Sequence, residues 1–136
     1  MNAVPITDSE LVSLFERGET AGENFHHSDH LRLAHAYLCE YPTLVAIGKF
    51  TEALKRYAAA RGKTHLYNET ITCAYFFLIR ERMARSGDAG WEEFVCNNPD
   101  LLIWKDGILG RYYHEATLKS ELARRVFVLP DKLLDR

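Results

Sequence analysis

The chain lacks several features that would assign it to a functional class at once. Its formal net charge is only −2, with 17 basic and 19 acidic residues among 136, and no basic stripe is present. No apolar run approaches the roughly 18 residues of a membrane span. The first ten residues lack the basic and apolar regions of a signal peptide. These absences argue against nucleic-acid and membrane partners, and they favour a cytoplasmic protein.

Cysteine is also scarce, and its spacing suggests no disulfide. Cys39, Cys73 and Cys96 are an odd number, show no C-x-x-C spacing and stand among apolar neighbours. We therefore expect reduced and mostly buried thiols. A nucleophilic role for Cys73 is the less favoured alternative, because buried thiols are usually inert.

The hydrophobic residues recur with a helical period along the chain. We expect Thr7 or Asp8 to cap a short first helix and Ser28 to cap a second. Pro42 is then expected to begin a third helix, which Gly62 ends. Shorter helical pieces follow in the last third of the sequence.

The most apolar segment predicts the centre of the fold. The letters ITCAYFFLI, residues 71–79, are apolar nearly all round, and several arginines follow them. A helix of this kind is buried on most sides. We therefore predict an all-α fold, a single domain over residues 1–136 with about five to seven helices in a bundle around a central helix near residues 68–85.

Four of the six histidines stand close together in FHHSDHLRLAHAYL, residues 25–38. His27 and His30 are on the same side as the apolar stripe of the second helix, whereas His26 precedes the expected cap and His35 lies off the stripe. We therefore expect His27 and His30 to contribute to a site, and His26 and His35 not to.

Glu69 is expected to join these two histidines. Short connections make consecutive helices antiparallel, so the second and fourth helices should run parallel, with their N-termini at one end of the bundle. Two imidazoles and a carboxylate in one layer could hold a divalent metal ion or transfer protons as an acid–base pair. Polar caps that face water are the simpler alternative.

Three further residues could belong to this pocket. Tyr67 and Tyr113 are the aromatic candidates, Tyr113 as a catalytic residue, although a core position is the favoured alternative for Tyr113. His65 could reach the same layer from a loop, although exposure to solvent is favoured for it.

Three motifs resemble those of an uncharacterised family of small bacterial all-helical proteins. They are F-x-H-x-x-H-L-x-x-A from Phe25, Y-N-E-T-x-T from Tyr67, and a closing Y-Y…S-x-x-A-R-x-x-F-V-x-P-D from Tyr112. Together they extend over most of the chain. The resemblance implies the same fold class and the same site location, but no activity.

The resemblance also bears on single positions. It adds Asn68 and Arg124 as candidate ligand-binding residues. The family pattern has a histidine where this chain has Asn68, and asparagine is a poor ligand for zinc or a late transition metal. If that histidine is a metal ligand in the family, the site is altered here, unless His65 takes its place.

Two functional hypotheses stay open. The first is an enzyme that acts on a small-molecule ligand through the His/His/Glu site, with or without one divalent metal ion and without a nucleotide cofactor. The second is a non-catalytic helical module that binds a ligand or a partner, or forms a homodimer. The sequence indicates neither a substrate nor a reaction type.

Overall fold

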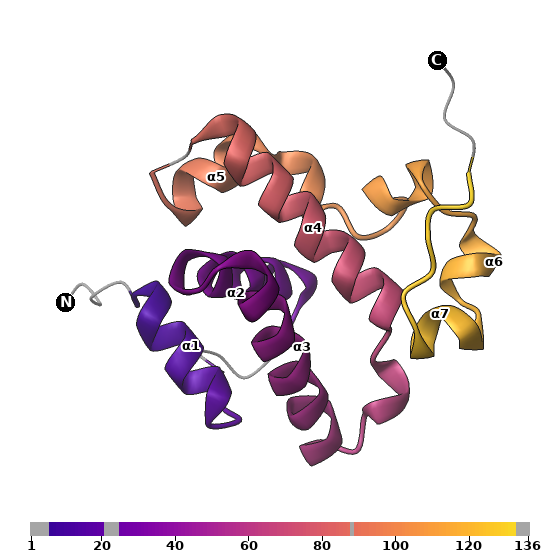
Figure 1. Ribbon diagram of the computed structural model, residues 1–136, viewed down its shortest axis with the longest axis horizontal. Helices are drawn as coiled ribbons and strands as arrows, with labels where there is room; N and C mark the ends of the chain where they lie inside the picture. The colour runs from indigo at the N-terminus through magenta and orange to yellow at the C-terminus, as the bar shows by residue number, and fades with distance from the viewer. Residues whose placement is uncertain (1–5, 21–24, 88, 133–136) are drawn as a thin grey trace. The chain divides into compact units, whose positions relative to one another are not determined.

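The computed structural model describes residues 6–20, 25–87 and 89–132. Every regular element in these ranges is a helix, and they contain no strand (Figure 1). The predicted all-α fold class is therefore confirmed. None of the described helices is long and apolar enough to cross a membrane.

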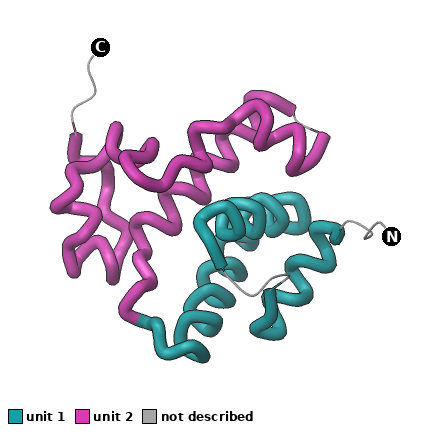
Figure 2. Tube along the Cα trace, turned by 180° about the vertical axis from the view of Figure 1, so that it is seen from behind, with its two compact units in different colours: residues 1–64 teal, residues 65–136 magenta. Residues whose placement is uncertain are grey.

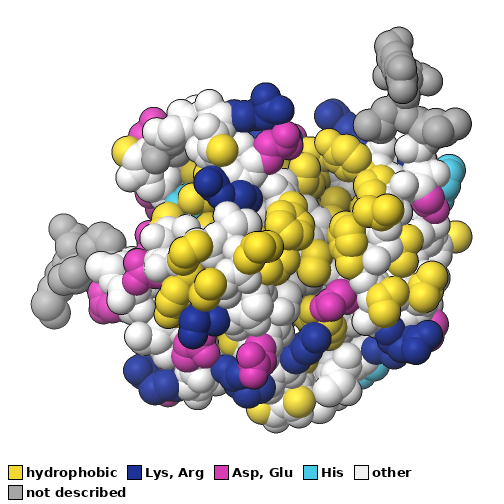
Figure 3. Space-filling model, in the orientation of Figure 1, with side chains coloured by type: hydrophobic (Ala, Val, Ile, Leu, Met, Phe, Trp, Pro, Cys, Tyr) yellow, Lys and Arg dark blue, Asp and Glu magenta, His cyan; other side chains and the backbone are white. Residues whose placement is uncertain are grey.

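The chain divides into two compact units, residues 1–64 and residues 65–136, which Figure 2 colours separately. Each unit packs its own helices against one another. The single domain over residues 1–136 stays a prediction. On the face that Figure 3 shows, acidic and basic side chains are interspersed, as the small net charge of the sequence suggests.

The first unit consists of three helices that pack against one another: α1 (Asp8–Glu16), α2 (His27–Glu40) and α3 (Thr43–Ala60). The Thr7 hydroxyl accepts a hydrogen bond from the backbone N–H of Glu10, whose carboxylate accepts one from the backbone N–H of Thr7. Such a capping box satisfies two donors at a helix start. Thr7 is therefore the cap of α1, and Asp8 is its first helical residue.

The start of α2 corrects the expected cap. His26, not Ser28, occupies the N-cap position, with the extended backbone that caps adopt. The backbone N–H of His26 donates to the Asp29 carboxylate over 2.8 Å. Asp29 is thus the acidic group of the first turn, as expected, but the helix begins two residues earlier than a cap at Ser28 would require.

Helix α2 is buried on nearly all sides in its middle. Residues 33–37 are all buried, and His35 keeps only 2% of its exposure. The expectation that His35 lies off the buried stripe is therefore wrong. A single stripe presupposes one solvated face, and this part of α2 has none.

The second unit contains α4 (Glu69–Ser86), α5 (Trp91–Asn97), α6 (Glu115–Leu118), α7 (Glu121–Arg125) and the 3₁₀ helices η2 (Pro99–Leu102) and η3 (Ile108–Arg111). Another 3₁₀ turn, η1 (Thr64–Leu66), stands at the sequence junction of the units. Helix α4 packs with α5, α7 and η3, which makes it the central helix of the second unit. Phe76 and Ile79 are fully buried in it.

Buried hydroxyls fix the C-terminal segment of the second unit to its core. The Thr70 hydroxyl donates to the backbone carbonyl of Val126 over 2.8 Å and accepts from the backbone N–H of Val128 over 3.0 Å. Thr70 is fully buried, so these bonds satisfy a hydroxyl that would otherwise be costly to bury.

The expectation of mostly buried thiols is wrong. Cys39 and Cys96 are exposed, and Cys73 is half-buried. None of the three forms a disulfide. Both exposed cysteines lie near helix ends, where even an apolar sequence neighbourhood leaves one side of the helix in solvent.

Candidate functional site

His30 belongs to an aromatic cluster of the first unit. Its ring stacks on Phe25 with 4.1 Å between ring centroids. Phe25 also contacts Phe15 and Tyr57, at centroid distances of 5.5 Å and 5.0 Å. The guanidinium of Arg61 lies 3.6 Å from the centroid of the Tyr57 ring. The phenylalanine and second histidine of F-x-H-x-x-H are therefore in direct contact.

This environment keeps His30 neutral. Burial, with a smaller contribution from the neighbouring His27, lowers the pKa of His30 from 6.5 to about 4, against the opposing effect of Asp29. Burial acts in this direction because it penalises the charged imidazolium. At neutral pH, His30 is an uncharged imidazole and a weak base.

Tyr67 and Glu69 meet at the start of α4 in the second unit. The Tyr67 hydroxyl donates a hydrogen bond to the Glu69 carboxylate. Burial and then this bond raise the pKa of Tyr67, and the nearby Cys73 adds to the shift. Burial is also the main cause of the raised pKa of Tyr113, with smaller contributions from Asp131 and Cys73. Cys73 is thus near both tyrosines.

Tyr113 has the core position that the sequence favoured for it. The residue keeps 2% of its exposure, and its hydroxyl donates to the backbone carbonyl of Val128 over 2.7 Å. This bond engages the only proton of the hydroxyl in packing. A catalytic role for Tyr113 would require the bond to break.

Asn68 has a structural role that accounts for the residue at this position. Its side-chain oxygen caps α4 by accepting from the backbone N–H of Ile71 over 2.9 Å. Its Nδ2 donates to the backbone carbonyl of Leu118 over 2.8 Å. The oxygen of this amide thus caps α4, and its nitrogen binds α4 to the end of α6. Both polar groups of the side chain are therefore in use.

Replacing Asn68 with alanine is expected to lower the free energy of unfolding by about 1–2 kcal/mol, since a cap is lost and the Leu118 carbonyl loses its donor. Asn68→Ser keeps an acceptor for the cap but is too short to donate to the Leu118 carbonyl, so its loss should be smaller. Urea denaturation followed by the fluorescence of Trp91 and Trp104, both in the second unit, measures the two losses. Equal stability of Asn68→Ala and the parent would contradict the double role.

Two further candidates from the sequence, His65 and Arg124, lie at the surface. His65 is exposed in η1. The sequence favoured this exposure to solvent over a place in the pocket. Arg124 is in α7, where its Nε donates to the Glu121 carboxylate over 3.1 Å. Its expected role in ligand binding stays a prediction.

The predicted pocket joins residues of different units. His27 and His30 belong to the first unit, and Glu69 belongs to the second. Within the units, the structure brings His30 onto Phe25 and Glu69 onto Tyr67. The meeting of the histidines with Glu69 stays a prediction.

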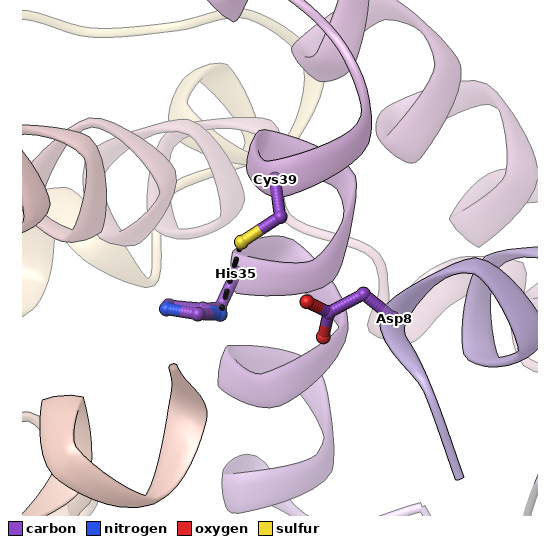
Figure 4. A group of neighbouring side chains, drawn as sticks. All are labelled: Asp8, His35 and Cys39. Carbon is purple, nitrogen blue, oxygen red and sulfur yellow. Dashed lines mark hydrogen bonds between the residues drawn. The ribbon is translucent and has the colours of Figure 1, made fainter. Parts of the chain in front are cut away.

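A different group of metal-binding side chains comes together in the first unit. One potential ligand atom each from Asp8, His35 and Cys39 lies within 4.8 Å of the other two (Figure 4). The Cys39 Sγ is 3.7 Å from His35 Nδ1. The spacing of four residues between His35 and Cys39, which puts both on one face of a helix, is the sequence signal that the stripe argument overlooked.

The thiol of this group is protonated at neutral pH. Partial burial, the negative charge of Asp8 and a hydrogen bond to the Asp8 carboxylate raise the pKa of Cys39 to about 11. A reactive cysteine needs the opposite shift, because the thiolate is the nucleophile. The group is therefore unsuited to act as a Cys–His nucleophile.

Comparisons with models of protein families, with curated proteins and with solved structures found no match for this chain. The resemblance of the three motifs to a bacterial family therefore stays a prediction.

Proposed function

We propose that this protein binds and acts on a small polar molecule through the imidazoles of His27 and His30 at the start of α2. The observation that carries the proposal is the His30 ring, stacked on Phe25 and kept uncharged by burial and by His27. The proposal rests on residues of the first unit alone.

A neutral imidazole suits some roles better than others. It offers one N–H donor and one nitrogen acceptor, so it can orient a polar ligand or bind a metal ion. General-base catalysis favours a pKa near the working pH. With a pKa of about 4, His30 is a weak proton acceptor at neutral pH. Of the two chemistries predicted for this site, binding and orientation therefore suit His30 better than proton abstraction.

Aromatic rings complete the recognition chemistry. The Phe25 ring covers one face of the His30 ring and holds its orientation, which reduces the side-chain entropy lost on binding. Sites for small molecules commonly combine aromatic walls with a few polar groups of fixed orientation. The start of α2 has both features.

A thermal-shift screen of small polar metabolites, on protein without a histidine tag, tests the proposal. Compounds that bind only the folded chain raise its melting temperature. We expect stabilising compounds to lose their effect in His27→Gln and His30→Gln, and to keep it in His65→Gln, a control at an exposed histidine. Turnover of each such compound is then followed by NMR.

Two outcomes would count against the proposal. Compounds that stabilise all three variants and the parent equally would place the ligand elsewhere in the chain. If the stabilising effect of a compound requires both histidines but the compound is never converted to a product, the protein binds it without acting on it. This result would favour the non-catalytic helical module.

A further inference from the structure

The strongest unassigned chemistry in the described chain is the group formed by Asp8, His35 and Cys39. Asp8 comes from the first turn of α1, whereas His35 and Cys39 come from successive turns of α2, and the three side chains converge between the two helices (Figure 4). Their ligand atoms, a carboxylate oxygen, an imidazole nitrogen and a sulfur, lie within 4.8 Å of one another.

The separation of sulfur and nitrogen fits a metal ion. Zinc bonds to sulfur and to nitrogen are about 2.3 and 2.0–2.1 Å long, and a tetrahedral angle then puts the two ligand atoms about 3.6 Å apart. The observed distance between Cys39 Sγ and His35 Nδ1 is 3.7 Å. The group therefore has nearly this spacing already, and only the carboxylate of Asp8 needs to adjust.

We propose that Asp8, His35 and Cys39 form a binding site for one divalent transition-metal ion of the zinc class. This site is separate from the proposed small-molecule site and shares no residue with it.

The backbone holds all three ligands on helices. His35 and Cys39 are four residues apart on α2, so they project from one face. Asp8 follows the capping box of Thr7, which fixes the start of α1. Helices α1 and α2 pack directly against each other. Ligands on packed helices are held more precisely than ligands on loops.

The ligand types define the class of metal. A thiolate and an imidazole favour zinc, cobalt and similar ions, whereas magnesium and calcium require oxygen ligands. His35 is buried, Asp8 is half-buried and Cys39 is exposed. An ion could therefore reach the site from the Cys39 side. Three protein ligands leave a fourth position for water, as in catalytic rather than structural zinc sites.

Titration of the full chain, without a histidine tag, with Co²⁺ and then Zn²⁺ tests the site. Cobalt replaces zinc in such sites, and a thiolate ligand gives it a near-ultraviolet charge-transfer band. We expect about one equivalent of Co²⁺, a thiolate band, and displacement by Zn²⁺. The band arises only when the sulfur of a cysteine is bonded to cobalt. A hydrogen bond between the same residues would stabilise the protein without producing this band.

Matched variants assign the ligands. Cys39→Ser should abolish the thiolate band, and Asp8→Asn should weaken binding at least about tenfold. Cys96→Ser, at the other exposed cysteine, and His65→Gln, at an exposed histidine, should both bind the metal like the parent. Because His35 is buried, His35→Gln could disturb folding. The variants at the exposed Cys39 and the half-buried Asp8 therefore decide the result.

The proposal is overturned if the parent binds neither ion, or if Cys39→Ser keeps the thiolate band. It is also overturned if binding is lost in His30→Gln and retained in both Cys39→Ser and Asp8→Asn, because the metal would then lie at the start of α2.

Discussion

Replacing Phe76 with alanine is expected to lower the free energy of unfolding of the second unit by about 3–5 kcal/mol. The side chain is fully buried in the middle of α4, and α4 packs with α5, α7 and η3. Truncation removes the buried ring and leaves a cavity that a packed helix cannot close. Urea denaturation followed by tryptophan fluorescence reports on this unit, because Trp91 and Trp104 both belong to it.

Phe77 is the matched control for this prediction. It is the next residue of the same helix, but it keeps 43% of its exposure. Phe77→Ala makes the same chemical change, and its loss should therefore be well below that of Phe76→Ala. If the two variants lose equal stability, or if Phe76→Ala loses less than about 1 kcal/mol, α4 is not the centre of its unit.

Acid is expected to destabilise the first unit through His30. The pKa of His30 is about 4 in the folded chain and 6.5 without burial, so below pH 6.5 the unfolded chain binds the proton more readily. The contribution to stability is complete above about pH 6.5 and is lost as the pH falls toward 4. At about pH 4.5 the loss from this group should reach roughly 2–3 kcal/mol.

His30→Gln isolates this effect from the titration of carboxylates. Glutamine keeps a polar side chain but cannot take up the proton. Denaturation followed by circular dichroism at about pH 4.5 and 7.5 should show a smaller acid-induced loss in the variant than in the parent. The same acid-induced loss in both proteins would show that His30 is not the group responsible.

The sequence predicted the helices better than their surroundings. Thr7 caps its helix through its side chain, as the sequence suggested. The apolar run of residues 71–79 lies in α4, where Tyr75, Phe76 and Ile79 are buried although Phe77 is exposed. These features depend on neighbouring residues and are visible in the sequence. At α2 the competition between His26 and Ser28 was decided by the Asp29 carboxylate, which can close a helix without a hydroxyl cap.

The burial of single side chains could not be read from periodicity. His35 is buried because the middle of α2 has no solvated side, and Cys39 is exposed although apolar residues surround it in the sequence. Both facts depend on which helices pack around α2. The same dependence concealed the group with Asp8, because its third member comes from α1, about thirty residues earlier in the sequence.

In the candidate site, too, local contacts could be predicted from the sequence, whereas burial could not. The contact of Phe25 with His30 and that of Tyr67 with Glu69 lie within the two motifs that the sequence singled out. The motif F-x-H-x-x-H predicted two important histidines but not the uncharged state of His30, which results from the burial of its ring and from His27.

The NMR titration of the imidazole protons tests the central claim most directly. The central claim is that His30 is a neutral imidazole at the start of α2, stacked on Phe25 and kept uncharged by burial. We predict that the His30 resonance titrates near pH 4, well below the ordinary imidazole value of 6.5. A His30 resonance that titrates near the ordinary pKa of 6.5 would contradict this claim and remove the basis of the proposed site.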